Sequence, residues 1–266
     1  MPGMKRRFAI VATLSLLIGE SNVLFAQTPD ELAKQTQNPV GSLISVPFQG
    51  NWDFGIGDRE AVGTTLNIQP VIPFGITKDW NVILRVIMPV QSQPIDDGQR
   101  LTGMGDTTMT VFLSPVKTGR VIWGAGPVML IPSATNQGLG TEKLGLGPSV
   151  VALVQPGKWT VGALWNQIWS VDGANDRADV NQMFLQPFAN YNLGQGMAVS
   201  AQVEASANWE ADDEQWTSYL LFSFSKVTLL GRRPVNLAAA AGPAVASPTG
   251  HPDWKLRFTA TFLFPR

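Results

Sequence analysis

The chain of 266 residues contains no cysteine and a single histidine, His251. Without cysteine, neither a disulfide framework nor a thiolate metal site is available. His251 falls in a predicted loop, and no serine can be tied to it by pattern as the nucleophile of an outer-membrane hydrolase. The sequence therefore predicts no catalytic residue, no metal site, no cofactor and no enzyme activity.

Long apolar runs are also missing after the N-terminal region. No later segment approaches the roughly 18 apolar residues that a transmembrane helix needs, which excludes helical membrane spans. Charge of either sign is modest, and the formal net charge is -1. Because the chain has no excess positive charge to attract a polyanion, we expect no nucleic-acid partner.

The N-terminus resembles a secretory signal. Lys5, Arg6 and Arg7 form a positive stretch, the run Phe8–Ile18 is apolar but too short to span a bilayer, and a small residue, Ala26, precedes a plausible cleavage point. We therefore predict that Met1–Ala26 is a signal peptide and that the protein is exported.

What the sequence has in abundance is apolar residues at every second position. In Trp254–Phe264 every even position is apolar, while the odd positions are polar except Leu263. Such alternation predicts a strand with one apolar and one polar face. Its length matches the roughly 9–11 residues of a strand that crosses a bilayer, and it must pair with the first strand, Ile44–Phe54, if the sheet closes.

About 12 segments of this kind follow one another after Ser42, which predicts an even-numbered outer-membrane barrel. Their connections alternate between short turns, such as Thr77–Asp79, and long loops, such as Gln91–Thr102. Acidic residues gather in the long loops and basic residues in the short turns, so both termini are expected at the periplasmic end. Tryptophans fall near the predicted strand ends, where interfacial girdles would place them: Trp52, Trp80, Trp123, Trp159, Trp169, Trp209, Trp216 and Trp254.

Prolines argue against an uninterrupted ladder, because each removes a hydrogen-bond donor that a barrel cannot place on a free edge. We expect them at bulges, rims or bends. They are Pro47, Pro70, Pro73, Pro89, Pro127, Pro148 and Pro187.

Residues 27–41 precede the first strand. Thr28, Pro29 and Glu31 form a helix start with a capping box, and Asn38-Pro39 ends the helical stretch. We expect either a short periplasmic or lumen-plugging helix, or a disordered tail. Residues 42–266 would then form the barrel.

Five ionisable residues lie on the polar face of the predicted strands, at the alternate positions that we call the polar parity: Asp53, Arg85, Glu204, Lys255 and Arg257. In a barrel they would face the lumen. Two interpretations stay open here: an internal ionic network that plugs the barrel, and a conductive pore lined by mixed charge. Lys255 and Arg257 could pair with Glu204 or meet a solute.

Several segments resemble a family of outer-membrane β-barrels described as transporter-like and linked to the meta-pathway of phenol degradation. The segments are Gln37–Pro47, Asn51–Gly55, Leu66–Pro73, Trp123–Pro127, Asp176–Asn181, Phe184–Phe188 and Phe262–Pro265. The resemblance implies passage of small solutes, aromatic or hydrophobic compounds among them. The chain departs from the wider outer-membrane pattern at its end, where Pro265 and Arg266 follow the aromatic Phe264.

Together these features predict an all-β, antiparallel up-and-down barrel with a short N-terminal helix in a bacterial outer membrane. We expect a passive, porin-like channel or transporter for small solutes. Its other expected partners are outer-membrane lipid, lipopolysaccharide and the barrel-assembly machinery. The alternatives are a soluble periplasmic β-sandwich or lipid-binding protein and, less favoured, an outer-membrane lipid hydrolase.

Overall fold

The computed structural model describes residues 27–95 and 98–265. The predicted signal peptide, Met1–Ala26, and the loop residues Asp96 and Asp97 lie outside the described residues. The elements in chain order are α1 (Pro29–Thr36), β1 (Ile44–Ile56), β2 (Ala61–Ile68), β3 (Val71–Gly75), β4 (Trp80–Pro94), β5 (Arg100–Met104), β6 (Thr107–Pro115), β7 (Val121–Ile131), the short 3₁₀ turn η2 (Gln137–Leu139), β8 (Lys143–Val154), β9 (Trp159–Gly173), β10 (Asn181–Gly194), β11 (Met197–Asn208), β12 (Trp216–Leu230), β13 (Arg233–Ala246) and β14 (Trp254–Phe264).

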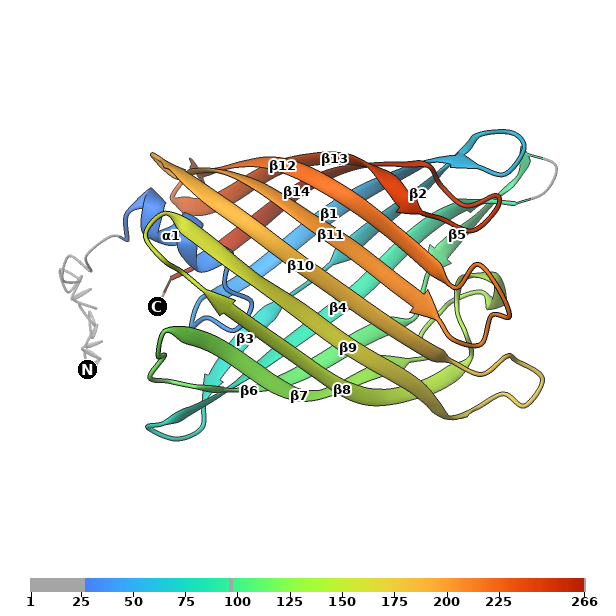
Figure 1. The fold of residues 1–266 in the computed structure, drawn as a ribbon, viewed down its shortest axis with the longest axis horizontal. Helices are drawn as coiled ribbons and strands as arrows, with labels where there is room; N and C mark the ends of the chain where they lie inside the picture. The colour runs from blue at the N-terminus through green and yellow to red at the C-terminus, as the bar shows by residue number, and fades with distance from the viewer. Residues whose placement is uncertain (1–26, 96–97, 266) are drawn as a thin grey trace, which may run out of the picture.

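The sheet closes on itself. β14 pairs antiparallel with β1 from Ile44 opposite Phe264 to Phe54 opposite Trp254. Between these two strands each neighbour along the chain pairs with the next, so the wall of the barrel in Figure 1 has no free edge. The predicted closure of the last strand on the first is confirmed.

The fourteen strand segments form twelve barrel strands. β2 and β3 both pair with β1 and β4, so they are successive halves of one strand, interrupted at Gln69-Pro70. β5 and β6 both pair with β4 and are likewise halves of one strand, interrupted at Gly105-Asp106. The chain is therefore a closed twelve-stranded antiparallel barrel, as predicted.

A proline accounts for the first interruption. Pro70 has no N–H to donate, so the strand shifts there, while the Gln69 N–H donates to the Pro47 carbonyl at 2.9 Å and the Val86 N–H donates to the Pro70 carbonyl at 3.1 Å. At the second interruption, the Gly105 N–H donates to the carbonyl of Pro89 in the neighbouring strand β4 at 2.9 Å. Backbone bonds thus bridge each break, and the barrel stays closed despite its prolines.

One predicted loop was wrong. Gln91–Thr102 was expected to be a long external loop, but β4 continues to Pro94 and β5 begins at Arg100. These two extensions pair with each other and form a hairpin beyond β6. Polar residues such as Gln91 and Gln93 look like loop residues in the sequence, yet they occupy the inward face of a strand that extends past the apolar belt.

The two faces of the wall differ in chemistry. On β14 the odd residues point inward, where Arg257 and Leu263 are only 8% and 1% exposed, while the even residue Phe258 is 51% exposed. Phe222 on β12 reaches 57%. A continuous exposed belt of apolar side chains is not found on soluble monomers and marks a membrane-contacting surface.

Aromatic residues border this belt at both ends. At one end Trp80 and Trp123 pack edge to face with ring centroids 6.1 Å apart, and at the other Trp209 and Trp216 do so at 5.6 Å. Such girdles lie at membrane interfaces. The closed barrel, the exposed apolar belt and the girdles place the chain in a bacterial outer membrane. No helix in the described part of the chain is long and apolar enough to span a bilayer.

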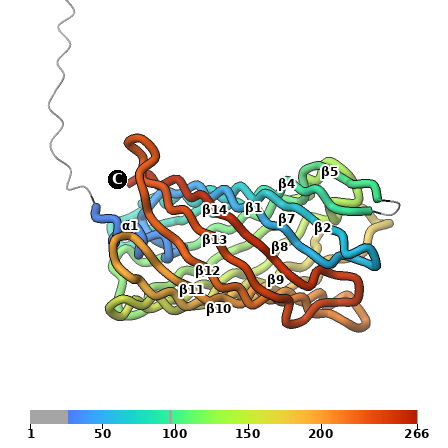
Figure 2. The backbone as a smooth tube through the Cα atoms, turned by 90° about the horizontal axis from the view of Figure 1, so that it is seen from above, coloured from blue at the N-terminus to red at the C-terminus, as the bar shows by residue number. Residues whose placement is uncertain are grey.

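The barrel has two distinct ends, seen in Figures 1 and 2. Short turns lie at one end, together with α1 and the end of β14, and we assign this end to the periplasm because outer-membrane barrels have short periplasmic turns. The turns of Gln195-Gly196 and Gly231-Arg232 have two residues each, and Gln195 and Gly196 both adopt the positive φ angles of a type I′ hairpin. The longer connections, including η2, lie at the outer end.

Candidate functional site in the barrel lumen

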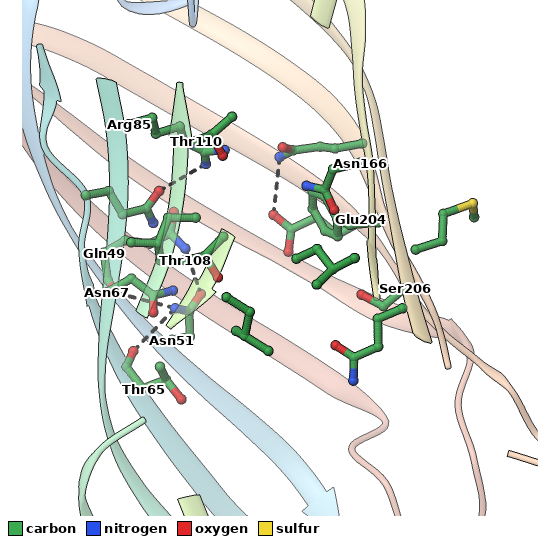
Figure 3. A pocket seen from close by; sticks show the side chains of 18 of the residues that line it. Gln49, Asn51, Thr65, Asn67, Arg85, Thr108, Thr110, Asn166, Glu204 and Ser206 are labelled. Carbon is green, nitrogen blue, oxygen red and sulfur yellow. Dashed lines mark hydrogen bonds between the residues drawn. The ribbon is translucent and has the colours of Figure 1, made fainter. Parts of the chain in front are cut away.

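A cavity of about 400 Å³ lies in the lumen, between the apolar packing at the periplasmic end and the outer loops. We call it the central cavity. All five residues of the polar parity line it, together with amide and hydroxyl side chains from six or more strands. Figure 3 shows Arg85, Asn51 and Glu204 converging on it from β4, β1 and β11. The structure thus brings together residues separated by up to 204 positions in the chain: Asp53, Arg85, Glu204, Lys255 and Arg257.

Arg257 and Glu204 form the central ion pair. The two terminal guanidinium nitrogens of Arg257 donate to the two carboxylate oxygens of Glu204 at 2.6 and 2.8 Å, and its Nε donates to Oδ1 of Asn51 at 2.7 Å. The carboxylate also accepts from the Gln202 amide at 2.8 Å. Both charged side chains are at most 15% exposed. This bidentate geometry fixes β14 to β11 across the lumen.

A second pair lies one step toward the outer end. The Lys255 ammonium is 2.9 Å from Oδ1 of Asp53 and 4.3 Å from the ring centroid of Tyr219. Lys255 and Asp53 are direct partners in the β1–β14 register. This pairing was not foreseen, although a strand register drawn from the predicted closure puts the two residues opposite each other.

Arg85 is different, because it has no acidic partner. Its guanidinium donates to Oε1 of Gln69 at 3.3 Å. Among the residues that the structure describes, the ion pairs within 4.0 Å involve other cations only. Arg85 lines the central cavity.

Below this polar layer, part of the lumen is apolar. Inward side chains of β4, β6, β8 and β9 pack into a buried cluster, and Val40 from the N-terminal segment completes it. Gly124 makes room for that residue, since a Cβ there would lie 2.8 Å from Cγ1 of Val40. The sequence analysis missed these inward apolar residues because it expected only polar side chains to face the lumen. The cluster is Val40, Ile83, Phe112, Val151, Leu153 and Leu164.

The N-terminal segment is fastened to the periplasmic end. Helix α1 has the predicted Thr28–Glu31 capping box and runs from Pro29 to Thr36. Lys34 donates to the Gln155 and Gly157 carbonyls in the turn between β8 and β9, at 3.3 and 3.1 Å. The carboxylate of Asp30 accepts from the Gly196 N–H in the turn between β10 and β11. Residues 27–41 are therefore ordered against the barrel, unlike the disordered tail that was the alternative.

Polar contacts tie the outer loops to one another. Lys143 is 3.0 Å from Asp179, and this hydrogen bond, with one from Ser170, lowers the pKa of the Asp179 carboxyl below its ordinary value. Elsewhere, the backbone N–H and hydroxyl of Thr249 donate to Glu214 at 2.9 and 2.7 Å, which lowers the pKa of that carboxyl. Both contacts hold one loop against the next around the outer mouth.

His251 lies exposed in the loop between β13 and β14. Its backbone N–H donates to the Pro248 carbonyl, and the neighbouring Ser247 hydroxyl donates to the Pro252 carbonyl, not to the imidazole. Within the described residues there is no group of three or more histidine, aspartate or glutamate side chains that could hold a metal ion. The geometry thus contains no nucleophile–base pair at His251.

Two solved structures have a similar fold. An outer membrane channel from Pseudomonas putida F1 matches 85% of this chain and 97% of its own, with a TM-score of 0.64 and 16% sequence identity. The NanC porin matches 83% of this chain and 100% of its own, with a TM-score of 0.51 and 12% identity. No protein-family model matches the chain, and no curated protein is significantly similar to it.

These likenesses agree with the barrel fold described above, which is that of outer-membrane channels. At such low identity they say nothing about the solute. The sequence resemblance to barrels linked to phenol degradation finds no counterpart among them and stays a prediction. The soluble β-sandwich alternative is wrong, since the sheet is one closed barrel with an exposed apolar belt.

Proposed function

We propose that the protein is a passive outer-membrane channel for small solutes, which pass through the lumen beside the N-terminal segment. The observation that carries this proposal is a series of cavities that share lining residues from the outer mouth to the periplasmic end. Its two cavities nearest the periplasmic end lie along the side of the lumen formed by β10 to β14 and β1.

The series starts at the outer loops. A mouth cavity of about 360 Å³ lies between residues 140–141 and 176–182 and shares Gln182 with the central cavity. The central cavity in turn shares Gln49, Gln186 and Arg257 with a connecting cavity of about 170 Å³. Shared walls of this kind favour a continuous passage over isolated voids.

The passage continues toward the periplasm beside α1. The connecting cavity shares Gln202, Ser223 and Ala238 with an inner cavity of about 240 Å³. Thr36, Gln37 and Pro39 of the N-terminal segment form one wall of that inner cavity. In this proposal residues 27–41 are a partial plug: Val40 fills the apolar half of the lumen, and the polar half beside it stays passable.

The lining indicates which solutes fit. Amide and hydroxyl groups dominate the walls of the connecting and inner cavities. A solute that enters can therefore replace its hydrogen bonds to water with hydrogen bonds to the wall. Small polar or amphipathic molecules suit such a wall best. The small aromatic or hydrophobic compounds implied by the sequence resemblance would have to carry a polar group to use this route.

A pair of matched variants tests the passage. Ala238 lines both the connecting and inner cavities, whereas Ala239 is exposed on the lipid face. We expect liposomes containing the wild-type protein or Ala239→Trp to swell in small neutral sugars. Ala238→Trp should slow swelling strongly. Equal swelling of both variants would show that solutes do not use this route, and absence of swelling in all three would remove the channel function.

The lipid-hydrolase alternative receives a direct check from His251→Ala. If lipid hydrolysis were observed with the purified wild-type protein and lost in this variant, the enzyme interpretation would replace the channel. We expect no histidine-dependent hydrolysis, because no serine hydroxyl reaches the imidazole in the described loops.

A further inference from the structure

We propose that the central cavity binds small monocarboxylate anions with a compact apolar body, and that Arg85 takes the carboxylate. The inference rests on the proposed channel function and names a solute class for it. It is carried by the charge balance of the cavity, the free donors of Arg85 and the apolar part of the cavity wall.

The charge balance leaves Arg85 in excess. Five charged side chains line the cavity: three cations, Arg85, Lys255 and Arg257, and two anions, Asp53 and Glu204. Each anion already has its own cation, at 2.9 Å for Asp53 and 2.6 Å for Glu204. Three minus two leaves one positive charge, and it belongs to Arg85. A charge enclosed by protein without an oppositely charged partner is costly in free energy, which favours the binding of a counter-ion beside Arg85.

The geometry of Arg85 suits a carboxylate. A guanidinium carries five N–H donors in a plane and binds a carboxylate through two parallel hydrogen bonds. The contact with Gln69 uses one of its terminal nitrogens, and that bond is long at 3.3 Å. Donors therefore remain for an incoming anion. The single excess charge matches a monoanion better than a doubly charged phosphate ester, for which Glu204 would add repulsion.

Part of the wall of the central cavity is apolar. Ile87 follows Arg85 two positions later on the same inward face of β4, and Leu130, Ile168 and Phe184 line the same cavity from β7, β9 and β10. A solute whose carboxylate meets Arg85 can place an apolar body against these side chains. The volume of about 400 Å³ is at the small end of the range for ligand sites, which limits the body to about the size of one aromatic ring or a short alkyl chain.

The probes are benzoate, its neutral analogue benzyl alcohol, and acetate, titrated into folded full-length protein in detergent by calorimetry. We expect benzoate to bind at least about tenfold more tightly than benzyl alcohol, because only benzoate forms charge-assisted bonds. Acetate should bind more weakly than benzoate, since it lacks the apolar body. Equal binding of benzoate and benzyl alcohol would overturn the inference.

Variants assign the site. Arg85→Gln should weaken benzoate about tenfold or more and leave benzyl alcohol unchanged, and Arg85→Lys should fall between, because a lysine keeps the charge without the planar fork. Arg59→Gln, the same change in the exposed turn between β1 and β2, is the matched control and should bind benzoate as wild type does. Undiminished binding by folded Arg85→Gln would overturn the inference.

Two further readouts keep the test decisive. Heat-dependent gel migration shows whether each variant is folded. If Arg85→Gln does not fold, Phe184→Ala replaces it, and the inference requires that this variant lose benzoate affinity relative to acetate. Swelling of wild-type liposomes in neutral sugar is measured in parallel. Swelling without benzoate binding removes the carboxylate site and keeps the channel, whereas benzoate binding without swelling supports the site and removes the channel.

Discussion

The ion pair between Arg257 and Glu204 is the contact whose loss should be felt most in both stability and selectivity. Glu204→Gln removes the carboxylate that accepts the 2.6 and 2.8 Å bonds and leaves the Arg257 guanidinium with Asn51 as its remaining partner. The Arg257 side chain is only 10% exposed. Removing one partner of a buried pair costs about 3–5 kcal/mol, and water in the adjacent cavity should reduce this to about 3 kcal/mol.

A double-mutant cycle with Arg257→Gln measures the interaction energy between the two side chains. Because the double variant leaves no uncompensated charge, it should be more stable than the sum of the single changes predicts, with a coupling of about 2 kcal/mol. The free energy of unfolding is measured by urea titration in phospholipid vesicles, followed by tryptophan fluorescence. Glu210→Gln, in the exposed outer loop, is the matched control and should change stability by less than about 0.5 kcal/mol.

Selectivity supplies an independent readout of the same substitution. In Glu204→Gln the cavity holds three cations and one anion, a net charge of +2 in place of +1. The reversal potential in a salt gradient should therefore shift toward greater anion preference. A coupling below about 0.5 kcal/mol together with an unchanged reversal potential would refute the view that this pair organises the lumen.

Three further predictions follow from other parts of the molecule. Leu32→Asp places a charge among Leu43, Val227 and Leu263, so α1 should detach from the barrel. Protease should then cleave within residues 27–41, and single-channel conductance should rise. Unchanged conductance would mean that the segment does not narrow the passage. The pKa of Glu214 is lowered by hydrogen bonds from Thr249, so this loop contact is fully present above the ordinary value of 4.5 and is lost as pH falls through the lowered value. The protection factor of the Thr249 amide, its intrinsic exchange rate divided by its observed rate, should stay constant from about pH 7 to pH 5 and fall at lower pH, and Glu214→Gln should remove this dependence. Phe222→Arg, on the lipid face, should destabilise the barrel by about 2–4 kcal/mol in vesicles, and a neutral effect would mean that this face meets water.

Much of the barrel was predictable from the sequence because lipid on one side and a polar lumen on the other impose strict alternation. The β14 pattern alone gave both faces correctly, and its closure on β1 follows from the absence of a free edge. Charged residues on the polar parity identified the lining of the central cavity for the same reason. The capping box likewise predicted α1, since its signal is local.

What escaped prediction depends on contacts between distant segments. Val40 has no periodic neighbours, so nothing in the sequence indicates that it fills the lumen beside Ile83 and Phe112. An irregularity at Pro70 was expected, but the break at Gly105 was not, because ladder register depends on both neighbouring strands. The partner of Lys255 was missed for a similar reason: the sequence analysis named Glu204 or a solute, whereas the β1–β14 register pairs Lys255 with Asp53.

In the proposed channel, the lumen is a passage beside an ordered N-terminal segment. Single-channel recording of the wild-type protein in planar bilayers tests it most directly. We expect discrete, ohmic conductance steps for wild type and for Ala239→Trp, with markedly smaller steps for Ala238→Trp. A folded wild-type barrel that inserts but stays electrically silent, and conducts only when residues 27–41 are deleted, would contradict it.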